Sequence, residues 1–139
     1  HRRDWWGKAR RMLGERFEVA VRNLTRAQER VGNVIEKLEE QDKDTDEVVA
    51  ALDLSKEKLH DAKEKLEEIK DLLPQDSNDD ALTPETFEKI KLLAREAKDL
   101  LKESREYLRK AVDEVKDLIN PEREAEDNDE NGEAEDDED

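Results

Sequence analysis

The 139-residue sequence contains no cysteine, and this absence excludes disulfide bonds, thiolate nucleophiles and every cysteine-ligated zinc or iron–sulfur site. Aromatic residues make up only 4% of the chain and hydrophobic residues 33%, whereas 49% of the residues are charged. A chain of this composition can build a slender core, but not the core of a large globule. The composition therefore favours one elongated helical domain.

Long apolar runs and glycine-rich phosphate loops are also missing from the sequence. No hydrophobic run approaches the roughly 20 residues that a membrane span needs, and no apolar signal-peptide segment precedes the first predicted helix. We therefore predict no transmembrane segment. Because the sequence begins at His1 rather than Met, we interpret it as a processed or trimmed chain, from which a signal or anchor could have been removed.

The net charge of −16 is distributed unevenly along the chain. Residues 1–16 carry six basic residues against Asp4 and Glu15, a local charge of +4, whereas residues 121–139 carry twelve acidic residues against Arg123, a local charge of −11. Phosphate binding relies on Lys and Arg side chains that release counterions. The excess of acidic residues thus argues against nucleic acid as the partner.

The segment 84–119 has the longest uninterrupted helical pattern. Apolar or small residues recur there every seven positions, and a second row follows three residues after the first, which predicts one helix-packing face. Thr83 and Pro84 are typical of a helix start, and Asn120-Pro121 of a helix end. The two rows are Phe87, Ala94, Leu101, Leu108 and Val115, and Ile90, Ala97, Ser104, Ala111 and Leu118.

Two earlier segments, at about 13–41 and 46–73, show the same spacing. Short polar connections join the three segments, Asp44 or Thr45 can cap the second helix, and Pro74 ends it. We therefore predict an all-α fold, an antiparallel three-helix bundle with coiled-coil-like packing over residues 13–119. The alternative is a homo-oligomeric coiled coil, in which the same rows face another chain. Gly32 lies inside the first helix, where a close approach of a neighbouring helix would account for it.

The two ends of the chain differ from the bundle. Residues 1–12 form a basic segment in which Trp5, Trp6 and Arg10 could contact a membrane surface. The favoured interpretation is that the tryptophans cap the bundle or lead into its first helix, since Gly7 and Gly14 argue against a helix from the very start. Residues 120–139 have almost no apolar side chains, which predicts an acidic, disordered tail.

Candidate catalytic residues are scarce. His60 is the only internal histidine, and we expect it to face solvent on a charged helix. Ser55 and Ser104 lie in the apolar rows, where we expect small core residues whose hydroxyls bond back to the preceding helical turn. The carboxylates have no predicted cleft to shift their pKa values. We predict no enzyme and no cofactor, but a structural or protein-interaction module that binds a protein partner or itself.

One motif offers ligand chemistry. Residues 127–132 followed by Glu138 satisfy the calcium-loop pattern, in which oxygen ligands surround the ion, a glycine allows the sharp turn and a closing carboxylate binds through both oxygens. The candidate calcium ligands are Asp127, Asp129, Asn131, Glu133 and Glu138. Ala134 replaces the usual larger apolar residue, and a tract of Asp, Glu and Asn meets most of the pattern by composition. The alternative is a loose attraction of divalent cations to the acidic tail.

The run from Leu24 to Glu40, followed by Asp44-Thr45 and the pattern of Leu52, Ala62-Lys63 and Leu66, resembles a group of uncharacterised exported helical-bundle proteins from the genomes of uncultivated, very small bacteria. A third helix similar to residues 95–118 belongs to the same resemblance, whereas Gly32 departs from it. The resemblance implies a helical hairpin and export, so that an extracytoplasmic or secreted location is expected. It implies no activity and no active residue.

Overall fold

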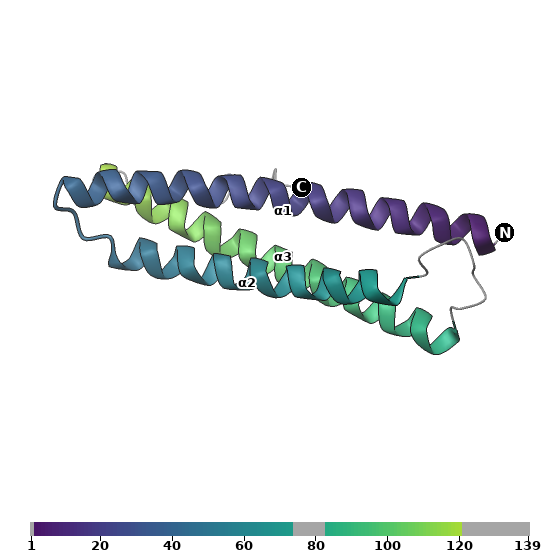
Figure 1. Cartoon of the computed structure of the whole chain (residues 1–139). Helices are drawn as coiled ribbons and strands as arrows, with labels where there is room; N and C mark the ends of the chain where they lie inside the picture. Colours follow the sequence, from purple (N-terminus) through teal and green to yellow (C-terminus); the bar gives the residue numbers. More distant parts are fainter. Residues whose placement is uncertain (1, 74–82, 121–139) are drawn as a thin grey trace, which may run out of the picture.

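The computed structural model describes residues 2–73 and 83–120, with side chains described from Gly14 onward. It contains three helices: α1 (Arg2–Glu40), α2 (Asp46–Leu72) and α3 (Pro84–Ile119). Figure 1 shows them lying alongside one another in a long bundle, with α1 and α2 joined by a short connection at one end. No strand occurs in the described ranges, and the all-α prediction is confirmed.

The bounds of α2 and α3 agree with the predicted ranges to within a residue, but α1 begins well before position 13. Gly7 and Gly14 lie inside α1 and do not interrupt it. A glycine in a helix interior costs at most about 1 kcal/mol relative to alanine. The long side chains and the alanine between the two glycines have high helix propensity, which offsets this cost.

Local hydrogen bonds fix the ends of the helices. The Thr83 hydroxyl accepts a hydrogen bond from the Thr86 backbone N–H at 3.1 Å, as a helix-capping threonine does. At the end of α1, Asp42 adopts a left-handed backbone with φ of 63°, and the Lys43 N–H donates to the Leu38 carbonyl at 3.0 Å. Before α2, Asp44 Oδ1 accepts from the Asp46 N–H at 3.1 Å.

Most of the predicted core residues are buried where the three helices meet. A smaller cluster of Ile69, Ile90 and Leu93 is formed by α2 and α3 near the end of α2. The larger cluster takes residues from all three helices: Leu24, Val31, Ile35, Leu38, Val48, Ala51, Leu52, Leu59, Ala62, Leu101, Leu108, Ala111 and Val115.

The three interfaces of the bundle are not equivalent. Contacts between α2 and α3 are far more extensive than those of α1 with either helix. Among the side chains that the structure describes, those with no exposed surface all belong to α2 and α3 and all are small, which lets the two backbones approach closely: Ser55, Ala62, Ala97, Ser104 and Ala111. α1 instead contributes large buried side chains. A Cβ atom added to Gly32 would meet nothing within 4 Å, so the expected close approach at this glycine is wrong.

Candidate functional site

A buried layer of three polar side chains joins the helices near the middle of the bundle. Gln28 of α1 is 5% exposed, and Ser55 of α2 and Ser104 of α3 are 0% exposed. The Gln28 amide Nε2 donates to Ser55 Oγ at 2.9 Å and lies 3.5 Å from Ser104 Oγ. One amide of α1 therefore holds the serines of both other helices.

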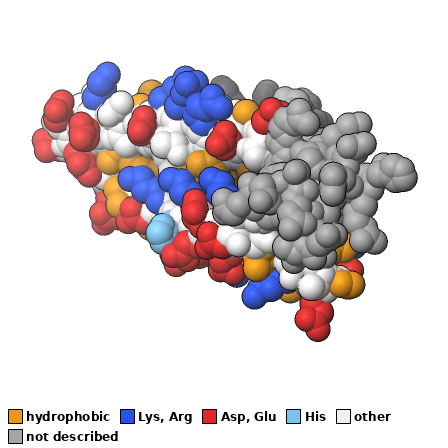
Figure 2. Space-filling view, turned by 45° about the vertical axis from the view of Figure 1, so that its right-hand side comes forward, with side chains coloured by type: hydrophobic (Ala, Val, Ile, Leu, Met, Phe, Trp, Pro, Cys, Tyr) orange, Lys and Arg blue, Asp and Glu red, His pale blue; other side chains and the backbone are white. Residues whose placement is uncertain are grey.

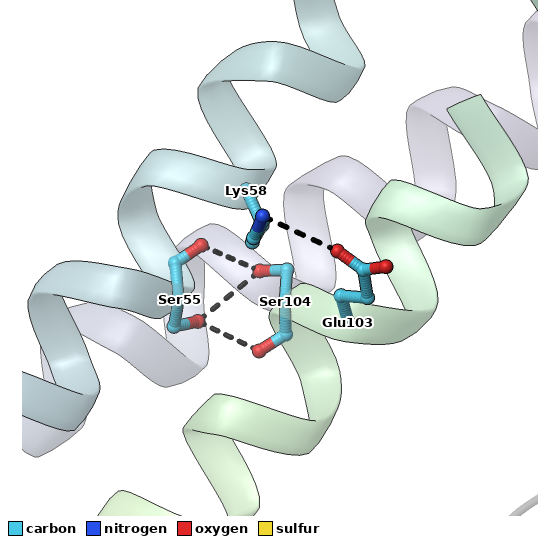
Figure 3. Close-up of polar contacts among 4 residues, drawn as sticks. All are labelled: Ser55, Lys58, Glu103 and Ser104. Atoms are coloured by element: carbon cyan, nitrogen blue, oxygen red, sulfur yellow. Dashed lines mark hydrogen bonds and ion pairs between the residues drawn. The ribbon is translucent and has the colours of Figure 1, made fainter. Parts of the chain in front are cut away.

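The two serines bind each other reciprocally (Figure 3). Ser55 Oγ donates to the Ser104 carbonyl at 2.8 Å, Ser104 Oγ donates to the Ser55 carbonyl at 2.8 Å, and the two Oγ atoms lie 3.1 Å apart. The expectation that these hydroxyls bond back to their own helix is therefore wrong. Because the α2 and α3 backbones are so close, the carbonyl of the opposite helix lies within reach.

Ion pairs flank this layer on the outer edge of the α2–α3 interface. Lys58 Nζ lies 3.4 Å from Glu103 Oε1 (Figure 3), and Lys65 Nζ lies 3.2 Å from Glu96 Oε1. The side chains are 30% to 48% exposed, so each pair contributes less than about 1 kcal/mol. The residue number on α2 rises from Lys58 to Lys65 while that of its partner on α3 falls from Glu103 to Glu96.

The carboxylate of Glu114, on α3, lies in an unfavourable electrostatic environment near the start of α2. Burial raises the pKa of Glu114 on α3, and repulsion by Glu47 of α2 raises it further, while Lys110 lowers it. Among the described residues, Glu114 Oε1 is buried and has no hydrogen-bond partner. The neutral form of this side chain is therefore favoured more than that of an ordinary glutamate.

Lysine and threonine side chains close the same end of the bundle. Lys43 Nζ donates to the Leu118 carbonyl at 3.2 Å, near the end of α3. The Thr45 hydroxyl donates to Glu39 Oε2 at 3.0 Å and is 5% exposed as a residue. These two bonds hold the connection between α1 and α2 against the end of α3, through Lys43, and against the end of α1, through Thr45.

His60 faces solvent, as predicted. Its side chain is 69% exposed, and Nε2 lies 3.1 Å from Glu64 Oε2 one turn along α2. It lies outside the buried polar layer. Within residues 2–73 and 83–120, no group of three or more His, Asp or Glu side chains is placed to hold a metal ion.

The predicted calcium ligands Asp127, Asp129, Asn131, Glu133 and Glu138 lie outside the described residues, and the calcium loop stays a prediction. The same holds for the side chains of Trp5, Trp6 and Arg10, although their backbone belongs to α1. None of the described helices combines the length and the apolar character that crossing a membrane requires.

The sequence interpretation missed Gln28, although the pattern held a signal for it. Val21, Gln28 and Ile35 recur every seven residues and form a third row beside the two core rows of α1. A polar residue at such a position between two apolar ones is typical of a buried hydrogen-bonding group that sets helix register. Its partners were not foreseeable, since they depend on how far the helices slide along one another.

Comparisons with models of known protein families, with curated proteins and with solved structures give no match to this chain. The resemblance carried by residues 24–70 and the expectation of export therefore stay predictions.

Proposed function

We propose that this chain is a structural or protein-interaction module without enzymatic activity. The buried polar layer is the observation that carries the proposal. The hydroxyls of Ser55 and Ser104 are the only serine hydroxyls in the described core, and both are used in bonds between helices. A serine acting as a nucleophile needs instead an accessible hydroxyl and a neighbouring general base.

The proposal includes an antiparallel arrangement of the three helices, with coiled-coil-like packing inside one chain. The order of the contacts supports it: Lys43 contacts Leu118, Ser55 contacts Ser104, and Lys65 contacts Glu96. The small residues at seven-residue spacing on α2 and α3 support a close antiparallel pair, onto which α1 packs. A rigid rod of this kind suits a spacer or a docking platform.

The buried layer also supports a role that depends on a defined shape. A core made only of leucine, valine and alanine can tolerate a shift of one helix by a heptad, because every position is apolar. A shift of α1 that separated Gln28 from the serines would leave the buried Gln28 amide without a partner, at a cost of about 1–3 kcal/mol. The layer thus selects one register, a use of buried polar groups that is known from coiled coils.

Cysteine cross-linking tests the arrangement. Since the chain has no cysteine, the double variant Ser55→Cys/Ser104→Cys carries the only thiols. The native Oγ atoms are 3.1 Å apart, so two sulfur atoms need little movement to reach a bond of about 2.05 Å. We expect mild oxidation to give a cross-linked monomer that migrates differently from its reduced form. Ser55→Cys alone is the control and should remain a monomer at low concentration.

A covalent dimer as the main product would favour the homo-oligomeric coiled coil instead. Sedimentation equilibrium of the unmodified chain is the companion measurement, since an oligomer has a mass that rises with concentration. The absence of enzymatic activity is tested separately. A catalytic activity that Ser104→Ala abolishes without unfolding the chain would overturn the proposal.

A further inference from the structure

One side of α1 carries a row of basic residues that faces α3. Buried Leu38 lies between Lys37 and Glu39, and successive residues of a helix are turned by about 100°, so these neighbours point to opposite sides of the core. Glu39 binds Thr45, the residue before α2, which places Lys37 on the side of α3. Arg30 and Arg16 lie on the same side as Lys37, because seven residues return a helix to nearly the same direction.

The side of α3 that faces α1 is basic as well. Ser104 points into the core, and Glu103, which precedes it, pairs with Lys58 of α2. Arg105 follows Ser104 and is turned the other way, toward α1. The same arrangement recurs seven residues earlier, where Lys98 follows a buried alanine and lies in line with Arg105.

Between Lys91 and Lys116, the rows on this side of α3 contain no acidic residue. Positions 91, 98 and 105 and positions 95, 102, 109 and 116 all hold lysine or arginine. We define the basic face by seven exposed side chains, none of which forms an ion pair with another described residue: Arg16, Arg30, Lys37, Lys98, Lys102, Arg105 and Lys116. A cationic surface of this extent in a chain of net charge −16 attracts a polyanion.

The lysine row of α2 provides a contrast. Lys56, Lys63 and Lys70 recur every seven residues on the side of α2 opposite to its α3 interface. Lys70 Nζ of this row lies 3.8 Å from Glu67 Oε2 on the same helix. Figure 2 shows a row of basic side chains with acidic side chains along one side of it. This row therefore includes a lysine that already has an acidic partner, whereas none of the seven side chains of the basic face forms an ion pair with another described residue.

We propose that the acidic segment 121–139 of the same chain binds the basic face. Its twelve carboxylates begin at Glu122, two residues after Asn120, and so follow the end of α3 where Lys116 lies. From Lys116 back to Lys98 the helix rises about 27 Å at 1.5 Å per residue. Nineteen residues in extended conformation span up to about 65 Å, so the segment reaches the whole face.

Connection through one chain favours this occupant over acidic partners in solution. A short tether gives an effective local concentration in the millimolar range, so even weak charge pairing fills the face for much of the time. Salt weakens the pairing, because the Debye length falls from about 10 Å at 0.1 M to about 3 Å at 1 M ionic strength. The acidic segment thus competes for the face with any other polyanion.

Paramagnetic relaxation enhancement in the full-length protein tests the proposal. Asp136→Cys introduces the only cysteine, to which a nitroxide label is attached. We expect enhanced relaxation of amide signals in residues 98–116 of α3 and 16–37 of α1, and loss of the enhancement at roughly 1 M salt. The variant Lys98→Gln/Lys102→Gln/Arg105→Gln should also lose it. The matched control Lys56→Gln/Lys63→Gln/Lys70→Gln removes equal charge from the other row and should retain it.

Three outcomes would overturn the proposal. The first is no enhancement on the basic face at low salt. The second is an equal loss in the control variant, which would indicate a response to net charge alone. The third is enhancement that arises only between chains, seen when an isotope-labelled chain without nitroxide is mixed with an unlabelled chain that carries it. Circular dichroism checks that each variant remains helical.

Discussion

The interface between α2 and α3 and the surface on which α1 packs are built from different side chains. Five small residues with no exposed surface bring α2 and α3 together. α1 is held instead by large apolar side chains and by Gln28, and Gly32 has open space beside it. Small residues allow the two helices to pack closely, but a close-packed interface has no room for added side-chain volume. The first interface should therefore respond to enlargement far more strongly than the second.

The largest effect is expected when volume is added between α2 and α3. Ala97→Leu inserts three carbon atoms where the native methyl group is fully buried, and we expect a loss of about 1–3 kcal/mol in the free energy of unfolding. Ala27→Leu is the matched control, since Ala27 is only partly buried on α1. Urea denaturation measures both. Equal losses in the two variants would contradict the difference between the interfaces.

The polar layer gives a second comparison across the same interfaces. Ser104→Ala removes the hydrogen bond that Ser104 Oγ donates to the Ser55 carbonyl and leaves that buried carbonyl without this donor, and we expect a loss of about 1–1.5 kcal/mol. Gln28→Leu removes a donor but supplies apolar volume beside Val31, so its loss should be smaller. Thermal unfolding ranks the two.

The register provides an additional readout for these variants. If the layer selects one register, Gln28→Leu should give doubled amide signals for α1 in a nitrogen–proton correlation spectrum, whereas those of α2 and α3 remain single. A larger loss of stability for Gln28→Leu than for Ser104→Ala would mean that α1 contributes more to the layer than its contacts indicate.

The seven-residue rows predicted α2, α3 and most of the core, because they depend only on the direction in which each side chain leaves its own helix. Leu52, Leu59, Leu101 and Leu108 are all buried. Thr83 marked the start of α3 correctly, since a cap is a local hydrogen bond. The same local reasoning misjudged the start of α1, where the summed propensity of the flanking residues outweighs two glycines.

Relations between helices were not predictable in this way. Whether Ser55 bonds to its own helix or to Ser104 depends on the distance between two backbones, which the small residues of both helices set together. The repulsion between Glu114 and Glu47 depends on the axial alignment of α2 and α3. A single sequence gives the direction of each side chain, but not which residue of another helix stands opposite.

A stabilising substitution on α1 tests the open space beside Gly32. Gly32→Ala should raise the free energy of unfolding by about 0.5–1 kcal/mol, because alanine loses less conformational freedom in a helix and its methyl group meets no atom within 4 Å. Urea denaturation measures the gain. A destabilised variant would mean that α1 packs more tightly at this position than its surroundings indicate, which would weaken the contrast with Ala97.

The smallest effect is expected at Glu114, where α3 opposes Glu47 near the start of α2. Burial is the main cause that raises the pKa of Glu114 in the folded chain, so its ionised form is less favoured there than in the unfolded chain. The folded state therefore retains the proton at pH values where the unfolded state has lost it. The stability that this residue contributes is complete below its unfolded pKa and is lost as pH rises through the folded pKa.

Glu114→Gln removes this loss, because the amide is neutral at every pH. We expect the variant to exceed the native chain in stability at pH 7 by less than about 1 kcal/mol, and the difference to vanish below about pH 4, where the native carboxyl is protonated. Thermal unfolding at the two pH values measures it, with exposed Glu106→Gln as the control. A difference that persists unchanged at low pH would assign the effect to packing of the amide. That outcome would mean that repulsion between Glu114 and Glu47 does not destabilise the α2–α3 interface.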